Sequence, residues 1–572
     1  MPGTLLKRLF PFLAWPRLNH QTLWNDLIAG VSVSLLAIPQ SLAYAQLAGV
    51  PPYFGLYAAF IPSIVGALFG SSGVLSTGPV ALTSLLTAAS VANLAPPGSD
   101  QFVAYVTLLA LISGLFQLGL GLARAGVLLN LLSHPVLMGF INAAALIIAL
   151  SQLPAMTGIQ VAQTDNFLVD TWHVLMRIYS LHVMSIVFGL LAFILLYGFR
   201  RFVPKLPGVL IAVGIVTWCS YYFDFAGHGG KVVGIIPTGL PSISTPAFSW
   251  EAIVALLPPA FVIALISFME AMSSSKIIAV RTRTRWDENQ ELIGQGLAKI
   301  AAAFCQSMPV SGSFSRSALN LASGARTGVS SLVAAAFVLM TLLFFTPLLY
   351  HLPKPALAAM IILAVANLID VAAMRYAWLV SRDDGMAAAI TFVATLVFAP
   401  NIQNGLLTGI IFSLGAFIYR LMSPRVVVVA PHPDGTLRDA EGLSLPPLHP
   451  EIAALRFDAS LFFANVSFFE DAVLKLERNN PDLKFIMIVA TGINYLDASA
   501  VEMLRALVKR LREVGITLVV SGAKKQVLVV MERTGLLHEI GDANVFSTDK
   551  LALDALLLRV GNRSVPGTSR PQ

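Results

Sequence analysis

The sequence has few of the residue types that build disulfide frameworks, metal sites or catalytic centres. It contains two cysteines among 572 residues, Cys219 and Cys305, and both lie in apolar stretches. This usage excludes a disulfide framework, and the nine scattered histidines form no cluster with cysteines or carboxylates that would predict a bound metal. The sequence also contains no glycine-rich nucleotide-binding loop and no paired nucleophile and base. We therefore expect no enzyme, no cofactor and no resident metal.

Charged residues are also scarce, and they are unevenly spread. They make up 12% of the chain, whereas 56% of the residues are hydrophobic and the mean hydropathy is +0.77. Residues 1–425 carry 21 basic and 13 acidic residues, and the much shorter segment 426–572 carries 16 and 17. The first region therefore has the composition of a membrane domain, and the second has the charge density of a soluble domain.

The net charge of +7 comes from the membrane region. A basic balance can indicate a nucleic-acid partner. Here the excess lies in short loops between apolar runs, where the positive-inside rule expects it. The sequence thus predicts a lipid bilayer around the first region and no nucleic-acid partner.

Apolar runs long enough to cross a bilayer recur through the first region. A bilayer core of about 30 Å needs roughly 20 apolar residues per helix. On this basis we predict fourteen segments, near residues 26–48, 52–70, 77–94, 103–123, 127–150, 181–200, 206–223, 252–275, 290–307, 312–330, 331–350, 356–372, 385–400 and 404–423. The third and the tenth look too short to cross alone, and an extended stretch precedes each of them.

The placement of basic residues supports this topology. Fourteen crossings that start in the cytoplasm place the following residues in cytoplasmic loops: Arg124, Arg200, Arg201, Lys205, Arg281, Arg283, Arg285, Arg326, Arg375 and Arg382. They leave Arg177, Lys231 and Lys354 in external loops. This bias predicts an inner (cytoplasmic) membrane protein with both termini in the cytoplasm. The two seven-segment halves, about 26–223 and 252–423, would then be inverted repeats.

Each half contains an interrupted segment at its third position. The first includes residues 76–81 (STGPVA) and the second includes residues 312–317 (GSFSRS). Irregular backbone at membrane depth survives only where protein or a water-filled cavity surrounds it. Paired interruptions of this kind point to a transporter binding site. Arg316, in the second, is a cation that is costly in a membrane unless it serves such a site.

Two helices that begin opposite each other near the midplane would hold an anion between them. Each beginning presents unpaired N–H groups and about half a positive charge. The predicted donors are the N–H groups of Val80, Ala81, Phe314 and Ser315, the hydroxyls of Thr77, Ser313 and Ser315, and the guanidinium of Arg316. The planar fork of Arg316 suits an oxyanion. The alternative is that Arg316 reaches the interface or pairs with a structural carboxylate.

Glu270 is a lone carboxylate in the eighth predicted segment. Intramembrane carboxylates commonly serve as proton relays or ion partners. We predict that Glu270 pairs with Arg316 in the empty carrier and that protonation releases Arg316 for the anion, which would couple a proton to anion movement. The alternative is a static structural pair. Asp287 is predicted to cap the next helix in a capping box with Gln290, and Lys299 receives no firm role.

The tail alternates predicted strands and helices. Residues 453–457, 485–489 and 516–520 have the pattern of buried strands, and residues 500–514 have helical periodicity. This alternation predicts a mostly parallel α/β sheet. The predicted domains are an N-terminal cytoplasmic segment (1–25), a transmembrane anion transport domain (26–424), a linker (425–450), the α/β domain (451–560) and a disordered tail (561–572).

Several motifs together resemble the SulP (sulfate permease) family of anion transporters, and the likeness covers nearly the whole chain. In the membrane region they are residues 38–45 (IPQSLAYA), 76–81, 287–292 (DENQEL) and 309–320 (PVSGSFSRSALN). In the tail, residues 461–465 (LFFAN) and 497–499 (DAS) resemble a STAS domain. Each motif alone would be weak, and together they are specific.

The resemblance implies a polytopic α-helical membrane protein with a core domain (segments one to four and eight to eleven), a gate domain (the remaining six), a cytoplasmic STAS domain and a homodimer. It also implies that Gln40 and Tyr44 complete the anion site; the alternative is that they hold helices together. The serine that is phosphorylated in some STAS relatives corresponds to Ala498. The resemblance therefore carries over no phosphorylation switch, although a regulatory protein could bind the domain.

The leading interpretation is proton-coupled uptake of sulfate or a similar oxyanion by an elevator-type, alternating-access movement. A dicarboxylate, bicarbonate or nitrate carrier or exchanger of the same family is the alternative within transport. A membrane-tethered STAS signalling scaffold is a different class. Arg316 and Glu270 argue against the scaffold, because it has no use for buried charge at the midplane. The expected partners are an anion, protons, lipid, a second copy of the chain and a regulatory protein.

Overall fold

The computed structural model describes residues 10–16, 18–127, 132–159, 167–203, 207–246 and 248–561. The chain divides into two compact units, Met1–Ser413 and Leu414–Gln572. The first unit is helical apart from two very short strands, and the second contains a six-stranded sheet.

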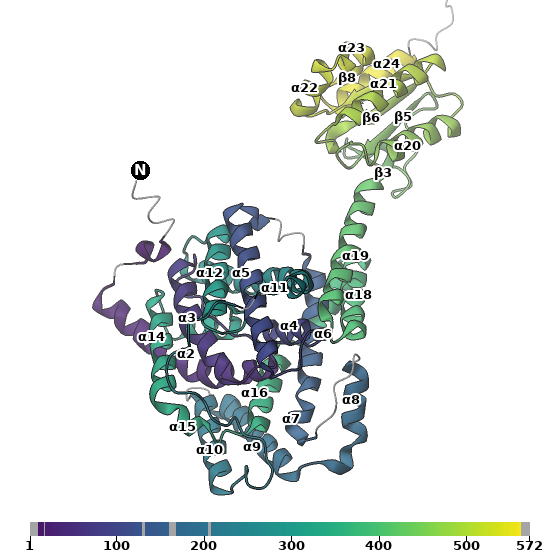
Figure 1. Ribbon diagram of the computed structural model, residues 1–572. Coiled ribbons are helices and arrows are strands. Elements are labelled where there is room, and N and C mark those ends of the chain that lie inside the picture. Colours follow the sequence, from purple (N-terminus) through teal and green to yellow (C-terminus); the bar gives the residue numbers. More distant parts are fainter. Residues whose placement is uncertain are drawn as a thin grey trace, which may run out of the picture. The chain divides into compact units, whose positions relative to one another are not determined.

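The helices of the first unit differ widely in length (Figure 1). In chain order they are α2 (His20–Leu47), α3 (Tyr53–Phe69), α4 (Ala81–Val91), α5 (Asp100–Leu122), α6 (His134–Ser151), α7 (Leu153–Thr157), α8 (Phe167–Met176), α9 (Val183–Phe202), α10 (Gly208–Tyr222), α11 (Trp250–Thr282), α12 (Glu288–Phe304), α13 (Phe314–Ala322), α14 (Val329–Met340), α15 (Thr346–Leu349), α16 (Lys354–Ala366), α17 (Val371–Val380), α18 (Arg382–Phe398) and α19 (Ile402–Met422), of which α19 runs on into the second unit. Two 3₁₀ turns, η1 (Pro11–Ala14) and η3 (Ile178–Ser180), and a π-helical turn, η4 (Thr341–Phe345), accompany them.

The predicted apolar segments correspond to helices of this unit. Within the described part of the chain, eight helical stretches are individually long and apolar enough to cross a membrane. The third and tenth segments, predicted to be too short to cross alone, are α4 and α13, with 11 and 9 residues. The prediction of membrane spans did not include α8 and α17 as separate helices. Each has 10 residues, which is about half the length that a membrane span needs. Residues 128–131 of the fifth segment, and Lys205, lie outside the described residues.

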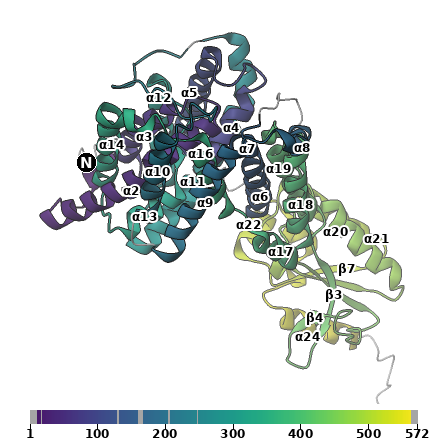
Figure 2. The ribbon, with the colours of Figure 1, turned by 90° about the horizontal axis from the view of Figure 1, so that it is seen from below.

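Glycines let several of these helices approach closely. A Cβ atom on Gly296 of α12 would lie 2.6 Å from the backbone nitrogen of Leu118 in α5. A Cβ atom on Gly139 of α6 would lie 2.2 Å from the carbonyl oxygen of Ala388 in α18. Figures 1 and 2 both show α6 and α18 side by side. Small residues are the usual means by which membrane helices pack, and these contacts build the scaffold around α4 and α13.

The two interrupted segments meet in a short antiparallel ladder. β1 (Thr77–Gly78) pairs with β2 (Ser311–Gly312). The Ser313 N–H also donates to the Ser76 carbonyl at 2.8 Å. The predicted extended stretches are residues 73–76 and 307–310, and the bonded strands lie directly after them, at 77–78 and 311–312. This pairing satisfies their backbone groups inside the membrane and brings the beginnings of α4 and α13 together.

The predicted cap of α12 is half right. Asp287 accepts the N–H groups of Asn289 and Gln290 at 2.9 and 3.1 Å, as an N-cap should. The Gln290 side chain, however, donates to the Phe69 carbonyl at 2.9 Å. The Asp287 N–H donates instead to the Ser71 hydroxyl at 2.8 Å. The reciprocal capping box is therefore wrong, because the end of α3 and the residues after it supply the partners.

The second unit is built on a sheet with the strand order β4-β3-β5-β6-β7-β8. Its strands are β3 (Val426–Pro431), β4 (Leu437–Asp439), β5 (Ile452–Phe457), β6 (Phe485–Val489), β7 (Thr517–Ser521) and β8 (Val545–Phe546). Its helices are α20 (Val466–Asn479), α21 (Ala498–Glu513), α22 (Lys525–Arg533), α23 (Leu536–Ile540) and α24 (Asp549–Gly561), with 3₁₀ turns at η5 (Ala490–Gly492) and η6 (Asp542–Asn544). β5 to β8 are parallel, which confirms the mostly parallel sheet.

The segment predicted as a linker, residues 425–450, contains two of these strands. β3 pairs antiparallel with β4 and with β5, so the segment extends the sheet. The run Val426–Val429 suits a strand, but the proline, glycine and aspartate residues that follow dominated the sequence signal. They form the β3–β4 turn, where Gly435 has a φ of 80°. The other predicted domain boundaries stay predictions, and residues 562–572 lie outside the described residues.

Candidate functional site

The beginnings of α4 and α13 line a cavity of about 620 Å³, which we call the half-helix cavity. Eight predicted site residues line it: Gln40, Tyr44, Val80, Ala81, Glu270, Ser313, Phe314 and Ser315. They come from α2, α4, α11 and α13, which belong to the predicted core segments. Residues of α9, α10 and α16, from predicted gate segments, form the other wall. The cavity therefore lies where the predicted core and gate meet.

The beginning of α13 presents unpaired donors to this cavity. Ser313 is the N-cap, and its hydroxyl accepts the Arg316 N–H at 3.4 Å. Within the described part of the chain, the N–H groups of Phe314 and Ser315 have no acceptor. The Phe314 side chain is 54% exposed even though it lies inside the membrane unit. These are the properties of a helix terminus that faces an anion site.

The beginning of α4 is capped differently. Its N-cap is Val80, whose side chain offers no hydrogen bond, so the first N–H groups of α4 depend on other partners. Gln40 of α2 lines the same cavity, and its buried Oε1 atom has no hydrogen-bond partner in the described structure. The structure thus brings Gln40 to the two helix beginnings.

Arg316 does not line the half-helix cavity. Its side chain is 2% exposed, and its Nη1 atom donates to the Pro79 carbonyl at 2.8 Å. The guanidinium lies by a separate void of about 20 Å³ between α2, α3, β1 and α14. Arg316 therefore lies behind the β1–β2 ladder, where it ties the second interrupted segment to the first. The prediction that its fork faces the anion does not match this conformation, because Arg316 does not line the half-helix cavity and its Nη1 atom donates to the Pro79 carbonyl, while its buried Nη2 atom has no hydrogen-bond partner in the described structure.

Thr77 also lies away from the half-helix cavity. Its hydroxyl accepts a hydrogen bond from the Gln295 side chain of α12 at 2.9 Å. Gln295 donates to Glu291 as well, at 3.1 Å. The Thr77 hydroxyl is hydrogen-bonded within this buried network. The structure therefore does not support its predicted contact with the anion. We did not predict a role for Glu291 or Gln295 from the sequence. A carboxylate inside an apolar segment is rare, and this alone could have indicated that Glu291 is important.

Glu270 lies in the half-helix cavity, but it does not pair with Arg316. Among the described residues, the two side chains are not in ion-pair contact, and the buried Oε2 atom of Glu270 has no hydrogen-bond partner. Arg316 and Lys299 are close enough to act on the Glu270 charge. The predicted ion pair is therefore wrong for this conformation, because Arg316 is held by the Pro79 carbonyl.

Lys299 is the second buried cation near Glu270. It is 0% exposed, and its Nζ atom donates to the Gln117 side chain at 2.7 Å and to the Ser267 hydroxyl at 2.5 Å. Ser267 lies one helical turn before Glu270 on α11. The sequence analysis assigned no firm role to Lys299, and the structure gives it polar side-chain partners on α5 and α11.

Arg200 and Asn367 lie on the gate wall of the half-helix cavity. The Arg200 guanidinium donates to the Asn367 side chain at 2.9 Å. Sequence reasoning placed Arg200 in a cytoplasmic loop and gave it no part in the site. An arginine at the end of a segment that faces a cavity is a signal that could have found it.

Comparison with known proteins is consistent with this geometry. The profile of the sulfate permease family matches residues 23–391, and the STAS domain profile matches residues 446–552. The chain is 33% identical to the probable sulfate transporter 4.2 of Arabidopsis thaliana over 557 residues, which are 93% of this chain and 81% of the relative. It is 32% identical to the sodium-independent sulfate anion transporter of Bos taurus over 561 residues, or 92% and 88%.

Two solved structures share the fold. SLC26A9 superposes with a TM-score of 0.88 at 21% identity, covering 98% of this chain and 94% of that chain. The transmembrane domain of the cyanobacterial bicarbonate transporter BicA superposes with a TM-score of 0.59 at 23% identity, covering 70% and 99%. From these matches and the helical membrane unit, the chain belongs to the sulfate permease family of multi-pass anion transporters and ends in a STAS domain.

Proposed function

We propose that this protein takes up sulfate or a similar oxyanion together with protons. The observation that supports this most is the half-helix cavity, where two helix beginnings and one carboxylate, Glu270, line the same space. An anion between the two beginnings is attracted by both helix dipoles and by unpaired N–H groups. Relatives named as sulfate transporters support sulfate as the substrate.

The position of Glu270 in the half-helix cavity supports coupling to protons. An ionised carboxylate and an anion repel each other strongly in a cavity of low dielectric constant. Protonation of Glu270 removes that repulsion, so proton binding and anion binding favour each other. Because such coupling is reciprocal, anion binding also favours the protonated carboxyl. This mechanism replaces the release of Arg316 and needs no contact between the two side chains.

Arg316 would act through the scaffold. Its hydrogen bond to the Pro79 carbonyl joins the segment before α4 to α13. The fixed charge also keeps the region behind the ladder positive, which favours a negative ligand at the helix beginnings. Lys299 would add to this potential from the side of α12.

The walls of the half-helix cavity suggest how the anion crosses. Helices of the predicted core carry the helix beginnings, and helices of the predicted gate supply the opposite wall. A movement of the core against the gate would carry the anion and Glu270 together, as an elevator mechanism requires. We further propose an inner (cytoplasmic) membrane location with cytoplasmic termini, a homodimer, and a STAS domain that binds a regulatory protein.

The test is uptake by the purified full-length chain in proteoliposomes. Wild-type protein should accumulate radiolabelled sulfate when an inward proton gradient is imposed. Glu270→Gln should exchange sulfate across the membrane but lose accumulation on the gradient. Glu251→Gln, on the exposed first turn of the same helix, is the matched control and should behave as wild type. Gradient-driven accumulation by Glu270→Gln would disprove the coupling role.

Competition separates sulfate from the alternatives. Unlabelled sulfate, fumarate, bicarbonate, nitrate and chloride would be added in excess during uptake of labelled sulfate at two pH values. Sulfate should compete best. Stronger competition by fumarate, bicarbonate or nitrate would favour the dicarboxylate, bicarbonate or nitrate carrier.

A further inference from the structure

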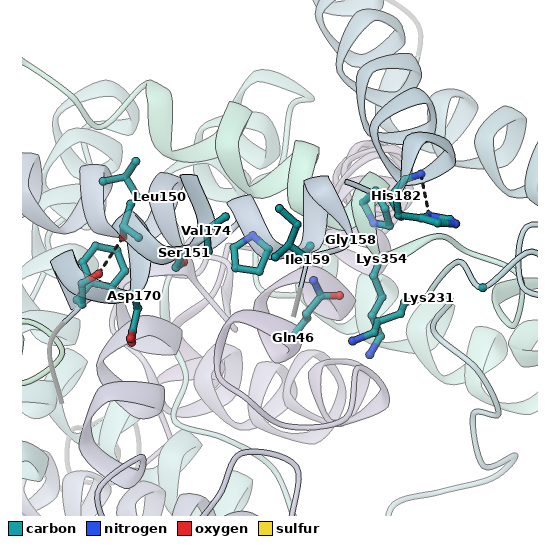
Figure 3. Close-up of a pocket in the computed structure, with 17 residues that line it drawn as sticks. Gln46, Leu150, Ser151, Gly158, Ile159, Asp170, Val174, His182, Lys231 and Lys354 are labelled. Atoms are coloured by element: carbon teal, nitrogen blue, oxygen red, sulfur yellow. Dashed lines mark hydrogen bonds between the residues drawn. The ribbon is translucent and has the colours of Figure 1, made fainter. Parts of the chain in front are cut away.

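A second cavity, of about 550 Å³, lies beside the first residues of α16 (Figure 3). We call it the lysine cavity, because Lys231 and Lys354 line it together with Gln46 and His182. Figure 3 shows the side chains of Lys231 and Lys354 next to each other and Gln46 beside them. Asp170 lines the cavity at the other end of this view, away from the lysines.

The backbone holds the two lysines together. The Lys354 N–H donates to the Lys231 carbonyl at 2.9 Å, and Val232 and Pro353 form an antiparallel bridge. The Lys354 ammonium group therefore lies close enough to Lys231 to be affected by its charge. Like charges on paired segments repel and destabilise the pairing. These main-chain bonds keep the backbones of the two lysines together, so the charges can separate only as far as their side chains reach.

The described surroundings do not neutralise these charges. In the part of the chain that the structure describes, neither ammonium group has a hydrogen bond or a carboxylate partner. Lys354 is also the first residue of α16, where the helix dipole disfavours a cation. The cavity therefore concentrates positive charge that an anion from solution would compensate.

His182 adds no charge to this cavity in its present contacts. Its Nδ1 atom accepts the Ser185 N–H at 3.2 Å as the cap of α9. Its Nε2 atom lies 3.0 Å from the His228 carbonyl and can donate to it. One acceptor nitrogen and one donor nitrogen describe a neutral imidazole. The positive charge of the cavity is that of the lysines and the α16 terminus.

The lysine cavity and the half-helix cavity lie one after the other along α16. Lys354 and Pro355 line the first, Met360 lines the second, and Ala356–Ala359 between them are buried. Six residues of helix span about 9 Å. Helix α2 has the same arrangement, with Gln46 in the first cavity and Tyr44 in the second.

The two cavities also differ in the loops that reach them. Lys231 and Lys354 lie in predicted external loops, whereas Arg200, on the wall of the half-helix cavity, lies in a predicted cytoplasmic one. We propose that the lysine cavity is an external capture site for a soluble oxyanion, at the outer end of its route to the half-helix cavity. This inference rests on the proposed uptake function. A divalent oxyanion gains most, because its attraction to each lysine is twice that of a monovalent one.

The first test is sulfate uptake at low ionic strength by full-length protein in proteoliposomes. The double variant Lys231→Gln/Lys354→Gln should raise the KM for external sulfate about tenfold, with kcat unchanged. The difference should shrink at high salt, where screening shortens the reach of both charges. Lys509→Gln, an exposed residue of α21, makes the same kind of charge change and should leave the KM unchanged. An unchanged KM in the double variant would overturn the proposal.

Conservative variants and lipid composition sharpen this result. Lys231→Arg/Lys354→Arg keeps both charges and should retain the wild-type KM, which excludes a mere folding defect. The KM effect of the glutamine variants should appear in liposomes made only of phosphatidylcholine. An effect that requires phosphatidylglycerol would assign the cavity to a lipid phosphate group and reject capture of a soluble anion.

A second measurement does not depend on transport. The purified full-length protein would be treated with a water-soluble, amine-reactive ester in sulfate or in gluconate at equal ionic strength. Sulfate should lower the labelling of Lys231 and Lys354, read by peptide mass spectrometry, at least about twofold, and should leave Lys509 unaffected. Protection without uptake would reject the proposed function while supporting the anion site. Uptake without protection would reject the anion site alone.

Discussion

Carboxylates are used in opposite ways in the two units of the chain. In the membrane unit, the completely buried Glu291 accepts the N–H groups of Ser71 and Ser72, both at 3.0 Å. In the STAS unit, Glu451 pairs with the partly exposed Lys484 at 2.6 Å. The first carboxylate holds a turn of irregular backbone where water cannot replace it. The second forms an ion pair that water can replace.

This difference teaches where single charges matter. The membrane region has few charges, and the buried side chains of Asp26, Glu291, Lys299 and Arg316 each make specific hydrogen bonds to backbone or polar side chains. Asp26, for example, accepts the N–H groups of Arg326 and Thr327 at 2.7 and 3.2 Å. The tail has a far denser charge set, largely in exposed pairs whose individual contribution is at most about 1 kcal/mol. We therefore expect substitutions to have large effects in the first unit and small ones in the second.

The largest effect is expected from Glu291→Ala. The substitution leaves the N–H groups of Ser71 and Ser72 and the Gln295 amide without their buried acceptor, which should cost about 3 kcal/mol of unfolding free energy or more. Glu288→Ala, three residues earlier on α12, removes only a partly exposed pair with Lys276. That control should cost less than about 1 kcal/mol.

Tryptophan fluorescence measures this difference selectively. All seven tryptophans of the chain lie within residues 1–425, so chemical denaturation in detergent followed by their emission reports on the membrane unit alone. If Glu291→Ala and Glu288→Ala shifted the denaturation curve equally, the buried carboxylate would stabilise the unit no more than the exposed one. That result would contradict the contrast between the two units.

Lys299→Met should have the next largest effect, on transport. It removes a cation that acts on Glu270 and leaves the Gln117 and Ser267 side chains without their shared partner. We expect sulfate uptake to fall about tenfold, which corresponds to about 1.4 kcal/mol in the barrier. The tryptophan transition should show that the variant is folded. Lys276→Met, at an exposed pair, is the control, and equal uptake by both variants would contradict the role of Lys299.

The architecture was largely predictable from sequence, because apolar length and basic-residue placement both reflect the bilayer. The two interrupted segments predicted α4 and α13, because clustered glycine, serine and proline residues favour a break in the helix there. Their antiparallel pairing at Thr77 was not predictable, since two-residue strands leave no periodicity. The linker assignment failed for a related reason, because turn residues outweighed the short strands around them.

The site was predictable as a set of residues, but the directions of their side chains were not. The sequence motifs predicted that Gln40, Tyr44 and the beginning of α13 lie at one site, and in the structure they line one cavity. Arg316 lies next to the same helix beginning, yet its long side chain reaches across the ladder to a carbonyl. Lys299 could be recognised as a charge in an apolar segment, but its partners lie on other helices, and one of them, Gln117, is 182 residues away in sequence. Side-chain reach and long-range pairing therefore account for the errors.

The smallest effect is expected from Asp434→Asn in the β3–β4 turn. The Thr436 hydroxyl and N–H, which donate to this carboxylate at 2.6 and 3.0 Å, hold the Asp434 pKa far below its ordinary value of 3.8. Because the folded pKa is the lower one, the ionised carboxylate stabilises the turn above pH 3.8, and this contribution disappears as the pH falls toward the folded pKa.

Hydrogen exchange measured by mass spectrometry tests this on peptides that cover residues 426–439. At about pH 7 the variant should exchange slightly faster than wild type in these peptides, and this difference should become smaller as the pH falls below 3.8 toward the folded pKa. Peptides of β6 and β7 should not change, because the Asp434 side chain bonds only within its own turn among the described contacts. If Asp434→Asn instead destabilised the whole STAS unit, the contrast between the two units would be contradicted. A single carboxylate at the surface would then matter as much as one inside the membrane unit.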